Sequence, residues 1–295
     1  MRPAARRRYW IEQRQFANLQ ESIWAPVFRR AIEAQIRPAV NFLKDQGYQM
    51  TIPQLQILVP EQPIRIALTR MYRDVFVRMA NISAKRIQDT VGKELRQEKA
   101  YGTPNAYWLQ LITEYMMTEG ATKVTMITDT TRDFIRRKMV EGYEQNLAID
   151  EMVQILLRNE INANRARLIA RTENTNITSL ATQASARRSG ILMQKVWISA
   201  QDNRTRRTPP DKFDHLDMDN KTAMMDEPFN VSGEFMQHPG DPAGSAGNVC
   251  NCRCTVAHEA VRDENGRLIR TPVPQVSRIF VERPRPSNIT QIITI

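Results

Sequence analysis

The sequence has few of the residues that build disulfide frameworks and most enzyme active sites. Its 295 residues include three cysteines and three histidines. The cysteines stand at positions 250, 252 and 254, and a Cys-x-Cys loop is too short to close an unstrained disulfide. We therefore expect free thiols and a reducing compartment. The sequence also lacks a glycine-rich phosphate loop, an internal repeat and a low-complexity segment.

A long hydrophobic run is missing too. A membrane-spanning helix needs about 18 or more consecutive apolar residues, and no such stretch occurs. The first ten residues are basic, but a polar helical pattern follows them, so we expect neither a signal peptide nor a membrane segment. Because 41% of the residues are hydrophobic and 25% are charged, the composition is that of a globular protein. The length allows two hydrophobic cores, and hence two domains.

Acidic residues are outnumbered, since 32 Asp and Glu stand against 42 Lys and Arg and leave a net charge of +10. Such an excess attracts polyanions, so nucleic acid or an acidic protein surface is the expected neighbour. A candidate phosphate-binding patch comprises Arg187, Arg188, Arg204, Arg206 and Arg207, and Arg6 to Arg8 form another. The alternative is an ordinary solvated surface with local acidic partners.

Apolar residues spaced three and four apart predict that the first two thirds of the chain are helical. The expected helices cover 9–46, 64–96, 108–120, a segment opening at Thr128, 151–158 and 162–189. Pro26 and Pro38 predict kinks or breaks in the first of them. Three prolines between 51 and 63 predict a linker.

The pattern changes after Gly190. Strands are expected at 191–199, 252–261 and 268–271, separated by a long aperiodic region at 202–241 that predicts functional loops. The sequence thus predicts an α+β fold, with a mainly helical N-terminal body, a small loop-rich C-terminal domain and an extended arm. Its expected parts are a helical region, 1–124, helices leading into the next domain, 125–190, a small α+β domain with the Cys/His cluster, 191–271, and the arm, 272–295.

A candidate metal site lies in the small domain. Cys252 and Cys254 are two residues apart, so their side chains share one face of a strand. Two sulfurs and two imidazoles make a tetrahedral zinc set, which would stabilise a region with little core. The candidate ligands are His215, His238, Cys250, Cys252 and Cys254. Their spacing matches no known zinc finger, and buried strand cysteines beside a hydrogen-bonded histidine remain the alternative.

A hydrolytic metal site is a second hypothesis for the same region. Its candidate residues are Glu173, Asp202, Asp214, His215 and Asp219. No short motif fixes their geometry, and acidic residues in such loops commonly hold turns, which favours structural roles. A Cys-His nucleophile has no residue that orients the pair.

An ordered set of motifs resembles the Mu F-like minor head proteins of tailed bacteriophages, the phage head morphogenesis family. The motifs are Arg171-Thr172-Glu173, Trp197, Asp202-x-Arg204-Thr205-Arg206, His215, Asp219, the loop with Phe235, Pro239, Gly240, Asp241 and Pro242, and Asn251-Cys252-Arg253-Cys254. The resemblance spans about residues 125–258. It implies that Arg171, Glu173, Asp202 and Asp241 are structural signature residues. Cys250 and the Asp219-Asn220 pair depart from the family pattern.

The resemblance implies a structural, non-enzymatic virion component that acts in head assembly at the portal vertex and in DNA packaging or ejection. The expected partners are the portal protein, packaged double-stranded DNA and a scaffold or major capsid protein, with no membrane. The expected location is the virion head, and the host cytoplasm during assembly. Apart from the resemblance, a structural zinc bound by the Cys/His cluster is the candidate cofactor, and buried metal-free thiols beside a hydrogen-bonded histidine are the alternative. A metal-dependent nuclease or toxin-like enzyme, or a sequence-independent DNA-binding module, is the alternative.

Overall fold

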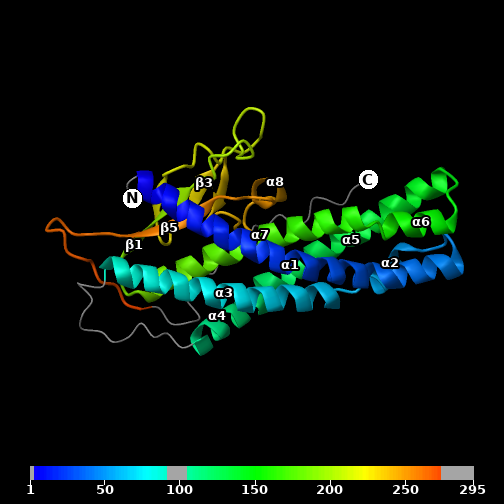
Figure 1. Cartoon of the computed structure of the whole chain (residues 1–295), viewed down its shortest axis with the longest axis horizontal. Helices are drawn as coiled ribbons and strands as arrows, with labels where there is room; N and C mark the ends of the chain where they lie inside the picture. The colour runs from blue at the N-terminus through cyan, green and yellow to red at the C-terminus, as the bar shows by residue number, and fades with distance from the viewer. Residues whose placement is uncertain (1–2, 92–104, 274–295) are drawn as a thin grey trace.

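The computed structural model describes residues 3–91 and 105–273. It shows an elongated helical body, here residues 3–91 and 105–190, with a small knob, residues 191–271, beside the N-terminal part of the first helix (Figure 1). The predicted α+β fold is confirmed. The expected helix end at 96, the turn after it and nearly all of the predicted arm lie outside the described residues. No helix in the described ranges is long and apolar enough to cross a membrane.

Three long helices form the centre of the body: α1 (Pro3–Gln46), α3 (Gln62–Val91) and α7 (Asn159–Arg188). The helix α1 continues through Pro26 and Pro38, so the predicted breaks are absent. Each proline removes only one backbone hydrogen bond. Buried side chains on both sides of each proline hold the helix against its neighbours and outweigh that loss.

Four shorter helices complete the body: α2 (Ile52–Leu58), α4 (Asn105–Met117), α5 (Glu119–Glu144) and α6 (Ile149–Leu156). The predicted linker is wrong over α2. Thr51 and Gln54 form a capping box at its start, and the Gln54 side chain accepts from the Thr51 amide at 2.8 Å. Pro53 stands in the first turn, where a helix needs no amide hydrogen.

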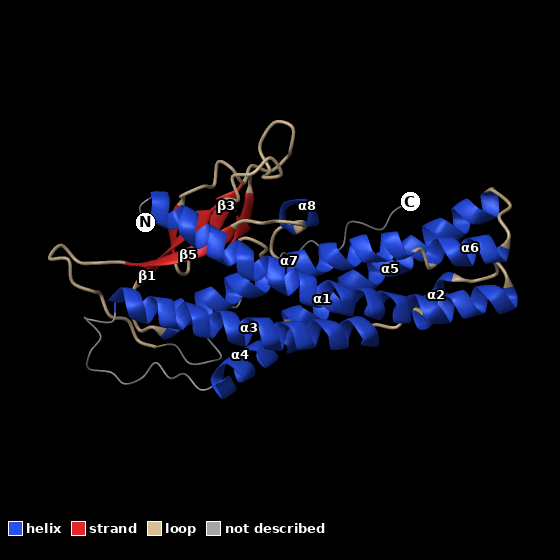
Figure 2. Ribbon diagram, in the orientation of Figure 1, coloured by secondary structure: helices blue, strands red, loops and turns tan. Residues whose placement is uncertain are grey.

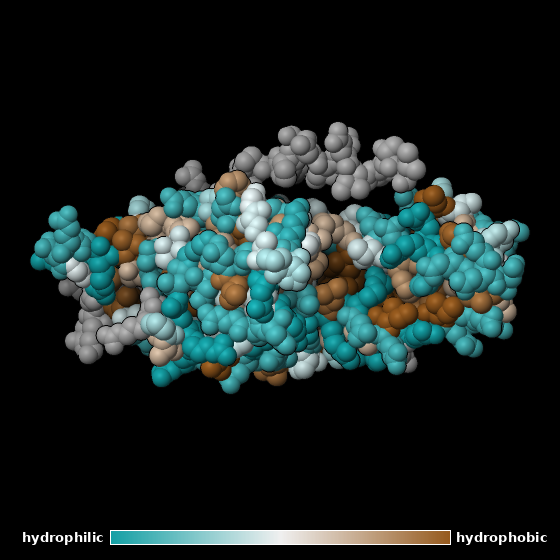
Figure 3. All heavy atoms as spheres, turned by 90° about the horizontal axis from the view of Figure 1, so that it is seen from above, coloured by the Kyte–Doolittle hydropathy of each residue, from teal (hydrophilic) through white to brown (hydrophobic). Residues whose placement is uncertain are grey.

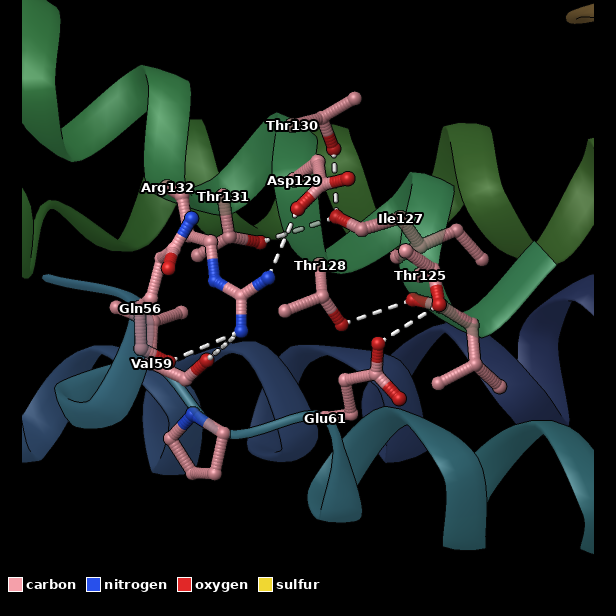
Figure 4. A network of polar contacts seen from close by, with 12 residues as sticks. Gln56, Val59, Glu61, Thr125, Ile127, Thr128, Asp129, Thr130, Thr131 and Arg132 are labelled. Atoms are coloured by element: carbon pink, nitrogen blue, oxygen red, sulfur yellow. Dashed lines mark hydrogen bonds and ion pairs between the residues drawn. The ribbon is translucent and has the colours of Figure 1, made fainter. Parts of the chain in front are cut away.

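The helix α5 begins nine residues before Thr128, so the predicted helix start there is also wrong. The polar side chains of this stretch bond within the helix and across to its neighbours instead of capping an end. The Thr128 hydroxyl donates to the Val124 carbonyl at 2.8 Å. Arg132 donates to the carbonyls of Gln56 and Val59, both at 3.0 Å, and so ties α5 to the connection between α2 and α3 (Figure 4).

The knob contains two small antiparallel sheets (Figure 2). The first has the order β2-β1-β5, and the second is the hairpin β3-β4. The strands and the short helix are β1 (Met193–Ile198), β2 (Thr222–Met224), β3 (Phe229–Val231), β4 (Glu234–Met236), α8 (Ala246–Val249) and β5 (Thr255–Ala260). The region predicted as loops therefore contains three short strands. The predicted strand at 268–271 is reduced to two isolated bridges, Ile191 to Arg270 and Arg262 to Leu268.

The first turns of α1 cover the edge of the larger sheet. Trp197 of β1 pairs with Val256 of β5, which leaves the other side of β5 without a strand neighbour in the sheet. The Tyr9 hydroxyl donates to the Val256 carbonyl at 3.0 Å, and the Trp10 indole donates to the Arg253 carbonyl at 3.3 Å. Side chains of α1 thus satisfy backbone groups of an edge strand and attach the knob to the body.

Candidate functional site

The structure brings His215, Cys252 and Cys254 together inside the knob. These residues are 1%, 2% and 5% exposed, respectively. His215 Nδ1 lies 3.5 Å from the Cys252 sulfur and 3.6 Å from the Cys254 sulfur. Among the described residues, 3–91 and 105–273, these three place their ligand atoms close enough to one another to hold a metal ion. The predicted pairing of His215 with the cysteines is therefore observed.

Asn248 sets the orientation of the His215 ring. His215 Nε2 lies 2.6 Å from Asn248 Oδ1. The amide nitrogen of Asn248 donates to Glu234 Oε2 at 3.0 Å and faces the Val231 carbonyl at 3.5 Å, so its oxygen must point to the ring. Because that oxygen only accepts, Nε2 carries a proton in either charge state. The Nδ1 atom that faces the sulfurs is left to exchange its proton.

The two thiols are not equivalent. A hydrogen bond from Cys254, together with the neighbouring His215, holds the pKa of Cys252 well below its usual value, against the effect of burial. Cys254 donates that hydrogen bond, and its pKa is raised well above the usual value. Burial alone would lower the pKa of His215, but the Cys252 sulfur outweighs it and raises that pKa. These shifts favour loss of the proton from Cys252, and the thiolate is the form in which a cysteine binds a cation.

Three contacts tie the cysteine loop to the helix α7. Arg171 donates to Asn251 Oδ1 at 2.6 Å and forms a two-pronged ion pair with Glu21 of α1 at 2.6 and 2.9 Å. The Thr172 hydroxyl accepts from the Asn251 amide at 3.0 Å. The Thr175 hydroxyl donates to the Cys252 carbonyl at 2.8 Å. The helix thereby fixes the backbone that presents both cysteine sulfurs.

Glu173 points the other way, into the core of the body. It accepts from the Tyr72 hydroxyl at 2.5 Å and pairs with Lys123 Nζ at 3.0 Å. Asn176 donates to the Tyr72 and Tyr115 hydroxyls at 2.8 and 3.0 Å. All five residues are buried, and together they form a network that joins α3, α4, α5 and α7. Glu173 is therefore separated from the candidate metal centre.

The acidic residues of the knob hold turns. Asp202 accepts from the Arg204 amide at 3.0 Å, and this bond, with one from Thr205, lowers its pKa although burial opposes the shift. Asp214 accepts from the Thr208 and Asp217 amides, at 3.0 and 2.8 Å.

Asp241 and Asp219 also hold turns through hydrogen bonds from backbone amides. Asp241 accepts from the amides of Gln237 and Ala243, at 2.5 and 2.8 Å. Asp219 accepts from the Ser199 amide at 2.9 Å. None of these carboxylates joins the group formed by His215 and the two cysteines.

Other predicted residues lie apart from the group. His238 is buried with Nδ1 3.0 Å from the Pro239 carbonyl, and neither His238 nor Cys250 belongs to the candidate ligand set. Arg206 is bound to the Cys250 carbonyl at 2.6 Å. The group of candidate ligands is therefore smaller than predicted and lacks His238 and Cys250.

The predicted arginine patch also divides. Arg187 donates to the Met225 carbonyl at 2.8 Å, and Arg188 lies over the Tyr107 ring. Thr172, which binds the cysteine loop, precedes Arg187 by fifteen residues on α7, or about 22 Å of helix. Arg187 and Arg188 are thus distant from the loop that carries Arg204, Arg206 and Arg207.

Sequence reasoning missed Asn248, Thr175, Tyr72, Lys123 and Glu21. Each contacts a residue of the motif set from a distant part of the chain. Tyr72 and Glu173, for instance, are 101 residues apart. No local pattern marks such partners, although Asn248 precedes the cysteines by only a few positions.

Comparison with protein-family models gives one finding. A model described as Phage Mu protein F like protein matches residues 89–257, which is more than half of the chain. The match runs from the end of α3 through α7 and the knob to the middle of β5, so it contains the group formed by His215, Cys252 and Cys254 and the α7 residues that bind the cysteine loop. Neither the curated proteins nor the solved structures contain a match.

Proposed function

This chain belongs to the phage Mu protein F like family of head morphogenesis proteins, and we propose from this premise that it is a minor head protein of a tailed bacteriophage. Its proposed site of action is the portal vertex during head assembly. The proposed partners are the portal protein and packaged double-stranded DNA, with a scaffold or major capsid protein as a further contact. Its proposed location is the virion.

The observation that carries a structural role is the use of the signature residues. Arg171 and Thr172 bind the cysteine loop, while Glu173 belongs to the core network of the body. A nuclease using Glu173, Asp202 and His215 would need these groups around one metal or water. Glu173 is bound to Tyr72 and Lys123, and Asp202 holds its own turn. Because these groups are held apart, the geometry favours a structural role over catalysis.

The end of the body farthest from the knob offers a surface for the portal. Ile52 and Ile57 of α2 are 64% and 79% exposed, and Val140 and Tyr143 near the end of α5 are exposed as well. Figure 3 shows a mainly hydrophilic face with hydrophobic patches, one of them toward the end that holds α6. Exposed apolar side chains of this size favour contact with a protein partner.

Co-purification tests this assignment. Tagged portal protein, isolated from cells that assemble procapsids, should retain the wild-type chain. The Ile52→Ser/Ile57→Ser variant should be depleted from those complexes. The matched control is Leu19→Ser/Ile23→Ser, which removes two exposed apolar side chains from α1. Absence of the wild-type chain from portal complexes and from assembled heads would overturn the proposal.

We also propose that His215, Cys252 and Cys254 bind zinc. Zinc lies about 2.3 Å from sulfur and about 2.0–2.1 Å from nitrogen, so a tetrahedral site separates the two kinds of ligand by about 3.6 Å. The observed separations are 3.5 and 3.6 Å. A cavity of about 10 Å³ beside the group, lined by Thr205 and Arg206 among others, is near the size of one water, the usual fourth ligand of a three-residue site.

Metal analysis of the purified protein tests the site. The wild type should carry about one zinc per chain, and His215→Ala and Cys252→Ser/Cys254→Ser should carry none. Cys250→Ser is the matched control, since Cys250 lies outside the group and should not affect the zinc content. Equal and negligible zinc in all four proteins excludes the site, and loss of zinc in the control as well would mean that Cys250 is a ligand.

A further inference from the structure

A groove between α1 and α7 has a volume of about 550 Å³. Seven of its ten lining residues are polar or charged and four are arginines; the lining comprises Arg14, Asn18, Glu21, Ser22, Ala25, Pro26, Arg29, Ala163, Arg167 and Arg171. We call this surface the basic groove. Neither the sequence analysis nor the family match assigns it a role.

The positive charge of the basic groove is not neutralised by the acidic residues that line it. Four arginines line it, and the single acid among the lining residues, Glu21, is already held by Arg171 through two bonds. Arg29 has Glu33 at 3.6 Å. Arg14 has no hydrogen bond or ion pair with the described residues, and Arg167 contacts only the Asn164 side chain of its own helix. At least two guanidinium groups therefore remain for an external anion.

The same charge continues onto the knob. Arg14 also lines a small cleft with Arg253, and Arg253 lines the cavity beside the metal centre together with Arg204. Arg14 is repelled by Arg253, Arg171 and Arg204, and burial together with these neighbouring cations lowers the pKa of Arg14. Like charges held this close are relieved by a bound polyanion.

The chemistry of the lining indicates which polyanion. Arginine forks, amides and hydroxyls are the groups that contact phosphate oxygens. A protein partner is anchored mainly by aromatic or large aliphatic side chains in a dry pocket, and here the apolar lining is only Ala25, Pro26 and Ala163. We propose that the basic groove binds the phosphodiester backbone of a nucleic acid, independently of its sequence.

The groove has the length that such contact needs. Arg14 and Arg29 are fifteen residues apart on α1, which corresponds to about 22 Å along the helix. Duplex DNA carries one phosphate per about 1.7 Å of its axis. Several arginines can therefore reach separate phosphates of one duplex. This inference deepens the DNA contact within the proposed function, on which it rests, and moves its centre from the predicted loop arginines to α1 and α7.

Fluorescence anisotropy with a labelled 20-base-pair duplex tests the inference on the full chain. Arg14→Gln/Arg167→Gln should bind roughly tenfold more weakly at moderate salt, and the slope of log K against log salt should fall by about two. The matched control is Arg70→Gln/Arg73→Gln, which removes the same charge from exposed positions of α3 that do not line the groove. Its salt slope should stay at the wild-type value.

The variant should remain folded, because neither arginine makes a tertiary bond with the described residues; its melting temperature should not fall. Equal losses in the groove and control variants would overturn the groove assignment while leaving DNA binding intact. Failure of the wild type to bind duplex at low salt would overturn both. Tighter binding of poly-L-glutamate than of DNA, lost in the groove variant, would replace the nucleic acid with an acidic protein segment.

Discussion

The buried ion pair between Lys123 and Glu173 permits a quantitative test of the structural role assigned to the signature residues. Both side chains are less than 10% exposed, and their charged atoms are 3.0 Å apart. At an effective dielectric of about 20, two charges at this distance attract by roughly 5 kcal/mol. Desolvation offsets much of that attraction, but removing one partner leaves the other charge buried and costs about 3–5 kcal/mol.

The change to make is Glu173→Gln, which keeps the shape and an acceptor for the Tyr72 hydroxyl but removes the charge. We expect the free energy of unfolding to fall by about 3 kcal/mol, which corresponds to a melting temperature lower by roughly 6–12 °C. Lys123→Met should cost a similar amount. The double variant should lie within about 1 kcal/mol of the wild type, because no unpaired charge then remains.

The pH dependence has a defined sign. Burial alone would lower the pKa of Lys123, but the Glu173 carboxylate outweighs it and raises that pKa above 10.5. The stability that the pair contributes is therefore fully present below pH 10.5 and is lost as the pH rises through the raised pKa. The difference in unfolding free energy between wild type and Glu173→Gln should be largest near neutral pH and shrink as the pH rises, because the buried, unpaired Lys123 of the variant loses its proton below pH 10.5.

Urea unfolding followed by circular dichroism measures these differences, and a double-mutant cycle isolates the pair. Strictly additive effects of the two single changes would refute the ion pair as a stabilising unit. A fully stable Glu173→Gln protein that loses a DNA-cleaving activity of the wild type would refute the structural role and revive the nuclease hypothesis.

Three further predictions concern the knob and its attachment. Gly240→Ala should destabilise the protein by more than about 2 kcal/mol in urea unfolding, because its φ is +79° and the new Cβ would lie 3.0 Å from the Asn176 amide nitrogen. The control Gly47→Ala, at φ +64° with no atom near the new Cβ, should cost only about 1 kcal/mol. Equal costs for the two variants would exclude the steric contact at Gly240. Asn248→Ala should weaken zinc binding by roughly 10- to 100-fold in competition with a chromophoric chelator, and unchanged affinity would contradict its role in orienting the histidine. Tyr9→Phe removes the hydrogen bond to Val256 and should lower the free energy of unfolding by about 1 kcal/mol at pH 8. Burial raises the pKa of Tyr9 to about 12, so this deficit should vanish as the pH rises above 10, where the tyrosine ionises in the unfolded state first. A deficit that is independent of pH would show that Tyr9 is not buried against β5.

Much of the body was predictable because its helices follow the spacing of apolar residues. The helix predicted for 162–189 is α7, and Gly190 ends it with a φ of +67°. Errors arose where a local rule was outweighed. Prolines in α1 did not break it, and Thr128 lies in the middle of α5 because its hydroxyl bonds inside the helix.

The strands of the knob were harder to predict. The strands β1 and β5 have six residues each and were expected, but β2, β3 and β4 have three each, which is too short to show a period. Such strands form because Trp197 and neighbouring buried side chains give them a core to pack on.

Residue types and their spacing by themselves determined the helical body, the excess of positive charge, and the choice of Cys252 and Cys254 as candidate ligands, although both cysteines precede β5 instead of lying on the predicted strand. The tertiary structure alone placed His215 beside the two cysteines, left His238 and Cys250 outside that group, and placed Arg14 beside Arg171 in one groove. The physical reason is range. Helix periodicity acts over a few residues, whereas hydrogen bonds, ion pairs and metal ligation join atoms that meet only after distant segments have packed together.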